Sequence, residues 1–472
     1  MAERGRVRSL IAGRDSLVAT PPDPFALLRT KRYVVLLALA AVLGIPISVV
    51  AYWFLELVDW SQREVFTNLP RALGFAHAPV WWPLPWLAVA GALVALTVRF
   101  LPGTGGHRPA EGFKPGGTPE PSELPGVALA SLATLAFGAV LGPEAPLIAI
   151  GGGLAACVPR FARRDSPAAT VAVVAAVGSF AAISTLLGSP ILAAFLLMEA
   201  TGLGGPMLEM VLLPGLLAAG LGALVFVGLD AWTGFGTFSL ALPNLPHFAR
   251  PDIAEFGWAL GIGVGAALAG TAIRWLALSL QPRVERRMLL STPVVGLAVA
   301  LLAIAFGQFS SHSASEVLFS GQTALPSLVA QSATYSAAAL ALLFLCKGLA
   351  YALSLSAFRG GPVFPSMFVG AAGGIALSHL PGLPLVPGVA MGIGAMCAVM
   401  LRFPITSVML ATLLLAVDGL AVMPLVIVAV VVAYVLSARL SPTVPGVASA
   451  GETAAPAASG APARVPVGAP GS

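Results

Sequence analysis

The sequence predicts an all-α polytopic membrane protein, folded as an inverted-repeat bundle of tilted and half-spanning helices. Three observations predict this fold class. Of the 472 residues, 58% are hydrophobic and only 10% are charged, whereas soluble proteins carry about 25% charged residues. Apolar runs follow one another along most of the chain, and several are too short to cross a bilayer. A glycine–proline motif occurs once in each half.

Charge is concentrated at the N-terminus, where residues 1–32 contain seven basic and three acidic residues. By the positive-inside rule this segment stays in the cytoplasm, so we expect a multi-pass protein of the cytoplasmic membrane. The segment has no apolar core that could serve as a cleaved signal peptide. Basic loops account for the net charge of +5, and no nucleic-acid partner is needed to explain it.

The first half contains apolar runs separated by short polar breaks. Tyr33–Phe54 is the first run, and a belt of tryptophans introduces a second that ends at Val98. Pro102–Pro125 is rich in glycine, proline and charge, so we expect the protein to shield it from lipid. The later runs are Leu124–Leu141, Ala168–Leu187, Pro190–Glu199 and Met207–Leu229.

The second half repeats this alternation, and some of its runs are short. Val294–Phe306 has 13 residues, and Pro190–Met198 in the first half has nine, where a straight crossing takes about 20. Many helices are therefore predicted to be tilted, broken or to stop midway. The other runs are Phe256–Leu280, Tyr335–Leu345, Val386–Leu401, Ile405–Val417 and Leu420–Ala438.

These patterns divide the chain into five parts. Residues 1–32 form a basic cytoplasmic segment, and residues 33–229 form the first transmembrane repeat. Residues 230–252 are a linker loop, and residues 253–438 form the second transmembrane repeat. Residues 439–472 consist mainly of Pro, Ala, Gly, Ser and Val, which cannot bury a core, so we expect a disordered tail.

The recurring motif is G-P-x-x-P. Gly142-Pro143-Glu144-Ala145-Pro146 is followed 219 residues later by Gly361-Pro362-Val363-Phe364-Pro365. Proline lacks an N–H and has a fixed φ, so it suits the first turn of a helix. Each copy therefore predicts a helix that begins abruptly, with an electropositive N-terminus and unpaired N–H groups. Two such ends that meet deep in a membrane protein make a site for an anion.

Further matches support an internal repeat. Gly188-Ser189-Pro190-Ile191 corresponds to Arg402-Phe403-Pro404-Ile405 at an offset of 214 residues, and the first long run has a counterpart that begins near Pro251 or Phe256. Three matches in order and at near-constant offset argue against chance. Broken helices at matching positions are typical of inverted-repeat transporters, so we infer that the repeat is inverted.

In these motifs the chain resembles the CLC family of chloride channels and chloride/proton antiporters. That family has G-[RK]-E-G-P at the start of a pore helix, where Gly142–Pro146 stands here, and G-x-F-x-P where Gly361–Pro365 stands. Its G-S-G-I-P pattern corresponds to Gly103-Thr104-Gly105. The resemblance implies a CLC-like inverted repeat, usually a homodimer with one anion pathway per subunit. It places the dimer surface on Pro190–Leu229 and Pro404–Ser437.

Glu144 is the central candidate residue. An intramembrane carboxylate is costly to bury and marks a functional position. By the resemblance, the Glu144 carboxylate occupies the place of a permeating anion and acts as the gate, so that protonation or displacement by chloride frees the pathway. The alternative is an acid that only stabilises a helix dipole, which contributes less than about 1 kcal/mol.

The other candidates for the anion pathway are Thr104, Gly105, Ala145, Val363 and Phe364. Thr104 would offer its hydroxyl to the anion, in a place where the family usually has serine; otherwise it is a turn residue. Val363 and Phe364 would supply backbone N–H groups and an apolar wall, or else only packing. The second residue of each motif is proline, so the site has fewer backbone donors than is usual in the family.

Glu199 is the candidate for a proton path. The inner proton-relay glutamate of the antiporters aligns with Ala200, and one residue is about 100° around a helix. Glu199 therefore need not face the same cavity, and we interpret it as an interfacial acid or ion-pair partner. The family's late tyrosine has no counterpart after Arg439, and Tyr434 lies too early. Both departures weaken the case for tight proton coupling.

The remaining charged and metal-ligating residues carry weaker signals. Lys347 and Arg402 could add positive field around an anion, but we interpret each as a snorkelling or interfacial cation. The five histidines lie mainly in loop-like stretches, and the three cysteines lie in apolar helical stretches. We therefore expect no metal site and no cofactor.

The sequence thus predicts transport of chloride, or a similar small monovalent anion, through a pore formed by helix N-termini and gated by a glutamate. Transport is passive or proton-coupled, and the missing inner glutamate favours the passive form. A secondary carrier for another anion is the alternative. A membrane-embedded enzyme is disfavoured because G-x-S-x-G and H-E-x-x-H are absent. The expected partners are the anion, protons if transport is coupled, the lipid bilayer and a second copy of the chain.

Overall fold

The computed structural model describes residues 28–112, 118–162, 167–202, 206–234, 242, 245–248 and 250–441. The first half of the chain forms eight α-helices among these residues. They are α2 (Lys31–Arg63), α3 (Leu69–Ala72), α4 (Pro83–Phe100), α5 (Leu124–Ala136), α6 (Glu144–Ala162), α7 (Ala168–Leu187), α8 (Pro190–Thr201) and α9 (Pro206–Thr233).

The second half forms α-helices in a matching order. They are α10 (Ile253–Arg286), α11 (Met288–Ser310), α12 (Leu325–Ala330), α13 (Ala337–Ala357), α14 (Val363–Ser378), α15 (Leu385–Leu401), α16 (Pro404–Leu414) and α17 (Gly419–Leu440). Short helical turns connect them, of which η2 (Pro102–Gly105), η3 (Pro109–Glu111) and η4 (Ala314–Glu316) matter below.

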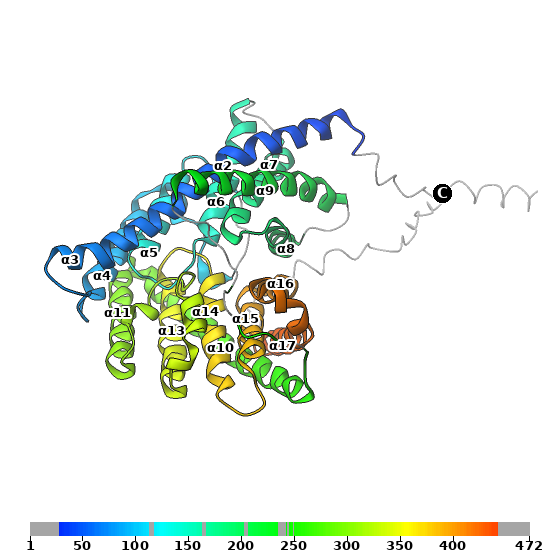
Figure 1. Ribbon diagram of the computed structural model, residues 1–472. Helices are drawn as coiled ribbons and strands as arrows, with labels where there is room; N and C mark the ends of the chain where they lie inside the picture. The colour runs from blue at the N-terminus through cyan, green and yellow to red at the C-terminus, as the bar shows by residue number, and fades with distance from the viewer. Residues whose placement is uncertain are drawn as a thin grey trace, which may run out of the picture.

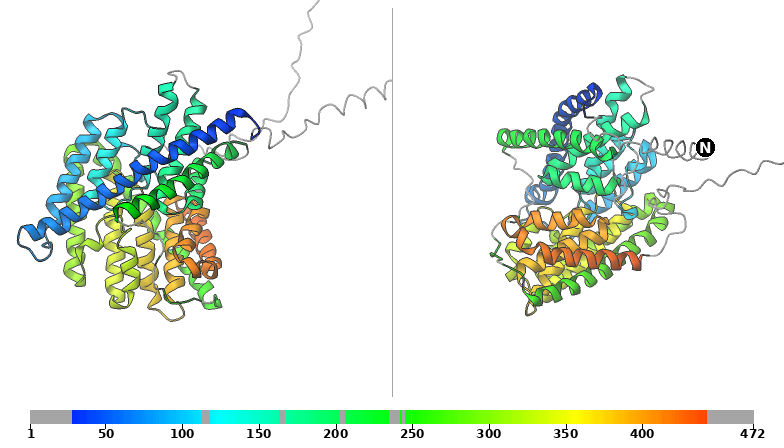
Figure 2. Two further views of the ribbon diagram at one scale, coloured as in Figure 1. Left: turned by 45° about the horizontal axis from the view of Figure 1, so that its top comes forward. Right: turned by 90° about the vertical axis from the view of Figure 1, so that its right-hand side faces the viewer.

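The two halves lie against each other as two layers, with α2–α9 above α10–α17 in the view of Figure 1 and again separated in Figure 2. Their internal packing follows one scheme. In the first half α6 packs on α7, α7 on α9 and α9 on α2; in the second half α14 packs on α15, α15 on α17 and α17 on α10. This recurrence agrees with the predicted repeat, and the predicted all-α bundle of long and half-length helices is confirmed.

Both layers also break at equivalent points. The cap residues after α7 and α15 are Gly188 (φ 61°) and Arg402 (φ 63°), both left-handed. The next helices begin two residues later, at Pro190 and Pro404. Glycine adopts this conformation without a steric penalty, whereas for Arg402 it costs about 1–2 kcal/mol. The correspondence of these two segments in the sequence is therefore repeated in the backbone.

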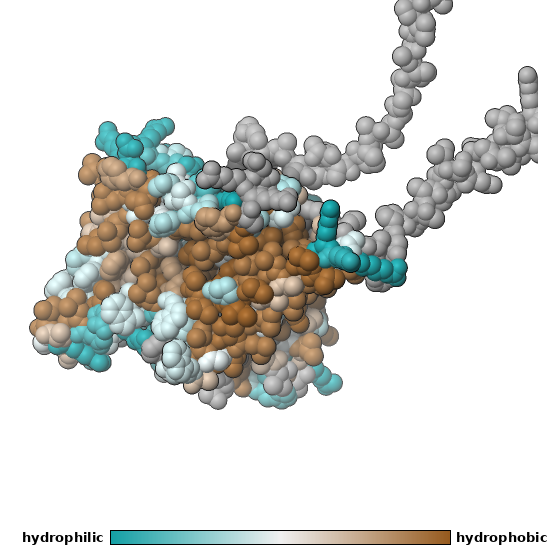
Figure 3. All heavy atoms as spheres, turned by 90° about the horizontal axis from the view of Figure 1, so that it is seen from above, coloured by the Kyte–Doolittle hydropathy of each residue, from teal (hydrophilic) through white to brown (hydrophobic). Residues whose placement is uncertain are grey.

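The chain is a multi-pass membrane protein. Eight helices in the described ranges are long and apolar enough to cross a bilayer, and α5, α8, α14, α15 and α16 are shorter. Hydrophobic residues cover most of the face seen in Figure 3, and hydrophilic residues lie mainly toward its edges. This arrangement fits a surface that is surrounded by lipid and meets water only at its margins.

Three of the predicted boundaries need correction. Val294–Phe306 is not a half-length helix, because it lies within the 23-residue α11, which begins five residues before Pro293. Polar residues and a proline near the helix start hid this length from the hydropathy pattern, since early proline is tolerated. α9 extends to Thr233, into the predicted linker, and α17 extends to Leu440, into the predicted tail. Residues 1–27 and 442–472 lie outside the described residues.

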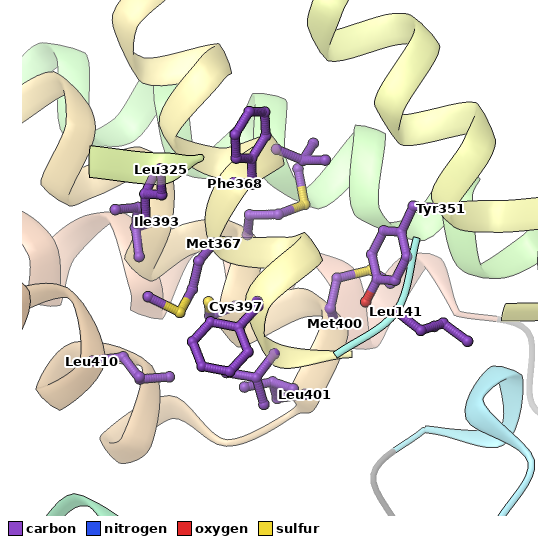
Figure 4. Close-up of a cluster of buried hydrophobic side chains, with 14 of the residues drawn as sticks. Leu141, Leu325, Tyr351, Met367, Phe368, Ile393, Cys397, Met400, Leu401 and Leu410 are labelled. Carbon is purple, nitrogen blue, oxygen red and sulfur yellow. The ribbon is translucent and has the colours of Figure 1, made fainter. Parts of the chain in front are cut away.

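The deepest part of the core belongs to the second half. Every residue of α15 except its first is buried, and so is the start of α14 from Val363 to Ala372. Small residues permit the close approach, because the helices touch backbone to backbone at Gly370 and Gly392. Figure 4 shows the apolar cluster around these helices, with the Tyr351 ring beside the segment at Leu141. This rigid block fixes the N-terminus of α14.

Candidate anion site

The two glycine–proline turns meet in the interior. The N–H of Gly142 donates to the carbonyl of Gly361 at 2.7 Å, and the N–H of Gly361 donates to the carbonyl of Gly142 at 2.6 Å. These bonds form an isolated antiparallel bridge between the two halves. Pro143 and Pro362 follow the bridge on either side, so the predicted meeting of the two motifs is confirmed.

Each turn leads directly into a helix. α6 begins at Glu144, one residue after its proline, and α14 begins at Val363, with Pro362 as its N-cap residue. The proline carbonyls accept the first bonds of the helices, from Leu147 at 3.0 Å and from Ser366 at 3.3 Å. Two electropositive helix ends are thus brought to one place by a short backbone bridge.

The Glu144 side chain lies between these helix ends. It is fully buried, and its Oε1 accepts a hydrogen bond from the N–H of Phe364 at 2.8 Å. Its Oε2 has no hydrogen-bond partner among the described residues. A carboxylate thus bridges from the first residue of α6 to the first turn of α14, in the position where a helix N-terminus binds an anion.

Gly142 and Gly361 form the notch that holds this carboxylate. A Cβ built on Gly142 would collide with both oxygens of Glu144, and a Cβ on Gly361 would collide with Oε2. Neither glycine has a positive φ. The glycines of the two motifs are therefore required for space and not for backbone freedom, a reason that the sequence did not show.

A tyrosine supports the notch from α13. The Tyr351 hydroxyl donates to the carbonyl of Pro362 at 2.8 Å, and both residues are buried. Nearby, Ser354 on the same helix accepts the N–H of Val140 at 3.0 Å. Two polar side chains of α13 thus fix both turns. The sequence analysis missed them, although a tyrosine in an apolar helix could have drawn attention, since its hydroxyl needs a partner when buried.

Thr104 and Gly105 lie in η2, on a loop with an unusual backbone. Gly103, Thr104, Gly105 and Gly106 all have positive φ values, of 79°, 51°, 70° and 94°. The Thr104 side chain is exposed, and its carbonyl accepts a hydrogen bond from Nε of Arg359 at 3.2 Å. No hydrogen bond between described residues joins this loop to Glu144. The structure thus brings Glu144, Ala145, Val363 and Phe364 together, whereas Thr104 and Gly105 are joined to the second motif through Arg359 and not through Glu144.

A cavity of about 350 Å³ lies beside the site, within the first half of the chain. Its lining includes Gly103 from the η2 loop, Ala145 next to the gate candidate, and Ala200 from α8. His107 and Glu123 contribute polar groups, and small apolar residues of α6 and α7 form much of the remaining wall. The cavity thus connects the region of the η2 loop with the start of α6.

Glu199 points away from this cavity. Its carboxylate accepts the N–H groups of Ile405 at 3.0 Å and Thr406 at 2.7 Å, together with the Thr406 hydroxyl at 2.6 Å. It therefore caps the N-terminus of α16, while its neighbour Ala200 lines the cavity. The two side chains face different surroundings, as a rotation of about 100° per residue requires.

Lys347 does not have the role that the sequence predicted. It is fully buried instead of snorkelling to the interface. Its ammonium donates to the carbonyls of Glu316, Val317, Leu318 and Phe319 at 2.8–3.4 Å and lies 4.1 Å from the ring centre of Phe368. A loop folded over the side chain provides these partners, which hydropathy cannot reveal. Arg402 is exposed and donates to Ser441 at 3.1 Å, as an interfacial cation would.

Known proteins match this chain in sequence. A family model described as "Voltage gated chloride channel" matches residues 90–438. Among curated relatives, one from Escherichia coli, provisionally named ion-transport protein YfeO, is 30% identical over 427 residues, which cover 86% of this chain and 94% of the relative. The YfeO protein of Escherichia fergusonii is 31% identical over 373 residues, 75% of this chain and 82% of the relative.

Solved structures show the same fold at lower identity. A slow cyanobacterial Cl⁻/H⁺ antiporter superposes with a TM-score of 0.69 at 19% identity, covering 86% of this chain and 94% of that one. A CLC-type fluoride/proton antiporter superposes with a TM-score of 0.63 at 20% identity, covering 86% and 96%. The helical bundle thus has the fold of these antiporters.

The chain belongs to the voltage-gated chloride channel family, the CLC family. The expected family is therefore confirmed. Members of this family are ion transporters and channels and not enzymes, so the membrane-embedded enzyme considered from the sequence is set aside.

Proposed function

We propose that this protein carries chloride, or another small monovalent anion, across the cytoplasmic membrane between the N-termini of α6 and α14. The Glu144 carboxylate occupies the anion's place and acts as the gate. Ala145, Val363 and Phe364 border the pathway at this point, and Thr104 and Gly105 border it at the η2 loop.

One observation carries the proposal. A fully buried carboxylate lies where two helix N-termini meet, accepts the Phe364 N–H at 2.8 Å, and leaves one oxygen without a partner in the described part of the chain. A helix end that holds a carboxylate offers the same donor and the same positive field to a free anion. Chloride and the carboxylate therefore compete for one place.

Gating follows from this competition. While Glu144 is ionised and bound to Phe364, it excludes a second negative charge from the same donor. Protonation removes its negative charge, and a high anion concentration displaces it. Anion flux is therefore expected to rise on acidification and with chloride concentration. An anion held by partial charges leaves its site more readily than one held by a full positive charge. Rapid release allows the anion to pass through the protein.

We propose that transport is passive. The position of the antiporters' inner glutamate is Ala200, which lines the cavity, while Glu199 is occupied in capping α16. Neither residue provides a carboxylate that faces the cavity at that position. Proton transfer along this route would need another group.

We further propose a homodimer whose N-termini lie in the cytoplasm. The surfaces that the family resemblance assigns to the dimer carry exposed aliphatic residues, among them Leu224 at 69% and Leu420 at 79% exposure. Paired subunits would cover these side chains. Crosslinking of purified protein through cysteines introduced at these two positions tests the dimer, and labelling of a cysteine introduced near Arg29 in intact cells tests the orientation.

Flux measurements in liposomes test the transport function. We expect the purified protein to move chloride, and the Glu144→Gln variant to lose the increase in flux on acidification, because an amide cannot act as a titrating anion. Glu199→Gln is the matched control, since it makes the same change outside the site. Parental flux and pH response in Glu144→Gln would remove Glu144 from the gate.

The same preparation separates the alternatives. Replacing chloride with fluoride, nitrate or a small organic anion identifies a carrier for another substrate. Fluoride belongs in the series because one solved relative in fold is a fluoride/proton antiporter. Proton uptake driven by chloride at a fixed stoichiometry would overturn the passive mechanism while leaving the anion pathway in place.

A further inference from the structure

Arg359 links the second motif to the η2 loop. It lies two residues before Gly361, is only 5% exposed, and comes from the segment between α13 and α14. Its Nε donates to the Thr104 carbonyl at 3.2 Å, and its Nη1 donates to the carbonyl of Phe358 at 3.3 Å. Its own N–H donates to the Thr134 hydroxyl at 3.2 Å. A guanidinium is therefore fixed against the loop that resembles the family's first motif.

The η2 loop has a strained backbone that needs a stabilising contact. Thr104 has a φ of 51°, and a β-branched residue in this left-handed region is strained by about 1–3 kcal/mol. In this conformation its carbonyl points to Arg359, while its side chain remains exposed. The surrounding glycines also have positive φ. Arg359 thus stabilises an arrangement in which the Thr104 side chain is exposed.

The charge of Arg359 is not neutralised by direct contact. None of the ion pairs between described residues includes it. The charged groups whose field reaches it are Arg108, Glu111 and Glu285. Arg108 pairs with both carboxylates at 3.4 and 3.2 Å, so these three groups together carry one net negative charge, but neither carboxylate forms an ion pair with Arg359 among the described residues. A guanidinium stays protonated in proteins, so a buried positive charge without a contacting carboxylate remains beside the Thr104 loop.

We propose that Arg359 determines anion affinity at the η2 end of the pathway, by providing a fixed positive charge and by positioning Thr104. The ligand class is a small monovalent anion, so this inference rests on the transport function proposed above. The anion is then bound by backbone N–H groups near Glu144 and by a full positive charge at a second point of the pathway. The alternative is a purely structural residue that only stabilises the loop.

Chloride dependence of flux separates the two roles. We expect Arg359→Gln to raise the half-saturating chloride concentration at least about tenfold, because a charge-assisted interaction is lost. Arg359→Lys retains the positive charge and is expected to raise the half-saturating chloride concentration less. Arg359→Met replaces the glutamine variant if that variant does not fold, since the long, flexible methionine side chain fills irregular buried space. Arg274→Gln is the control, because this arginine contacts the Val399 carbonyl and not the loop.

A second substitution tests the structural alternative. Thr104→Gly removes the strain at φ 51°, so the loop no longer needs to be held. If Arg359 acts through its charge, adding Arg359→Gln to Thr104→Gly still raises the half-saturating chloride concentration relative to Thr104→Gly alone. No further rise in the double variant, or parental chloride dependence in Arg359→Gln, would overturn the proposal. If the parent protein moves no monovalent anion in the same liposomes, the transport function itself fails and this inference fails with it.

Discussion

Replacing Gly142 with alanine is expected to open the proposed gate without changing Glu144 itself. The three atoms nearest to a Cβ at this position all belong to the Glu144 carboxylate, and the contact is too short to exist. The φ of Gly142 is not positive, so alanine brings no backbone strain. The flexible end of the Glu144 side chain is therefore what must move, and it must leave the Phe364 N–H.

The size of the effect follows from the bond that is lost. A hydrogen bond to a charged group contributes about 1.5–3 kcal/mol, and each 1.4 kcal/mol changes an equilibrium about tenfold. Gly142→Ala should therefore shift the balance between the bound and the displaced carboxylate by about 10- to 150-fold. The matched control is Gly142→Ala combined with Glu144→Ala, in which no carboxylate remains to collide with the new methyl group.

Chloride efflux from liposomes at two pH values measures this shift. In Gly142→Ala we expect higher flux at neutral pH and a smaller increase on acidification, close to the behaviour of Glu144→Gln. The double variant should resemble Glu144→Ala alone. Both changes act on the displacement of the same carboxylate, so their effects are not additive. Lower flux in both the single and the double variant would show that the methyl group blocks the pathway, and the reasoning would be wrong.

Three further predictions concern the support of the site, each measured by thermal unfolding of the detergent-purified protein. Tyr351→Phe leaves the buried Pro362 carbonyl without its 2.8 Å donor and should lower the free energy of unfolding by about 1–3 kcal/mol; an unchanged melting temperature would contradict this. Lys347→Met leaves four buried carbonyls without their shared donor and should lower the free energy of unfolding by about 1–3 kcal/mol, whereas a gain in stability would show that the buried charge is a net burden. Glu199→Ala removes the cap of α16 and should cost about 0.5–2 kcal/mol with parental chloride dependence; an altered flux would instead place Glu199 on the pathway.

The sequence was informative where local chemistry determines structure. A glycine–proline pair before a stretch of small residues favours a helix that begins at or just after the proline. α6 and α14 begin in this way, as predicted. The same holds for the breaks at Gly188 and Arg402, where a proline follows two residues later. The motifs and their spacing were therefore enough to identify the repeat and the fold class, and together with the family resemblance they singled out the residue that lies between the helix ends.

The sequence was silent where a contact joins distant segments. Lys347 is partnered by carbonyls about 30 residues away, and Arg359 by a carbonyl 255 residues away. A cation in an apolar run looks the same whether it reaches the interface or a folded loop. Likewise, Gly142 and Gly361 look like flexible turn residues until their partner, the Glu144 carboxylate, is seen in the space above them. Such roles depend on tertiary packing, which local patterns do not encode.

The geometry also explains how two prolines can stand in the motifs of an anion pathway. They remove two N–H donors, and the N–H groups of Gly142 and Gly361 are used by the bridge between the halves. Among the described hydrogen bonds, only Phe364 donates to the Glu144 carboxylate from another residue. An anion in this place would thus be held by few donors and by two helix dipoles. A weakly bound anion is released quickly. The full charge of Arg359 is therefore better placed at the η2 loop than beside Glu144, whose carboxylate must move out of the proposed pathway.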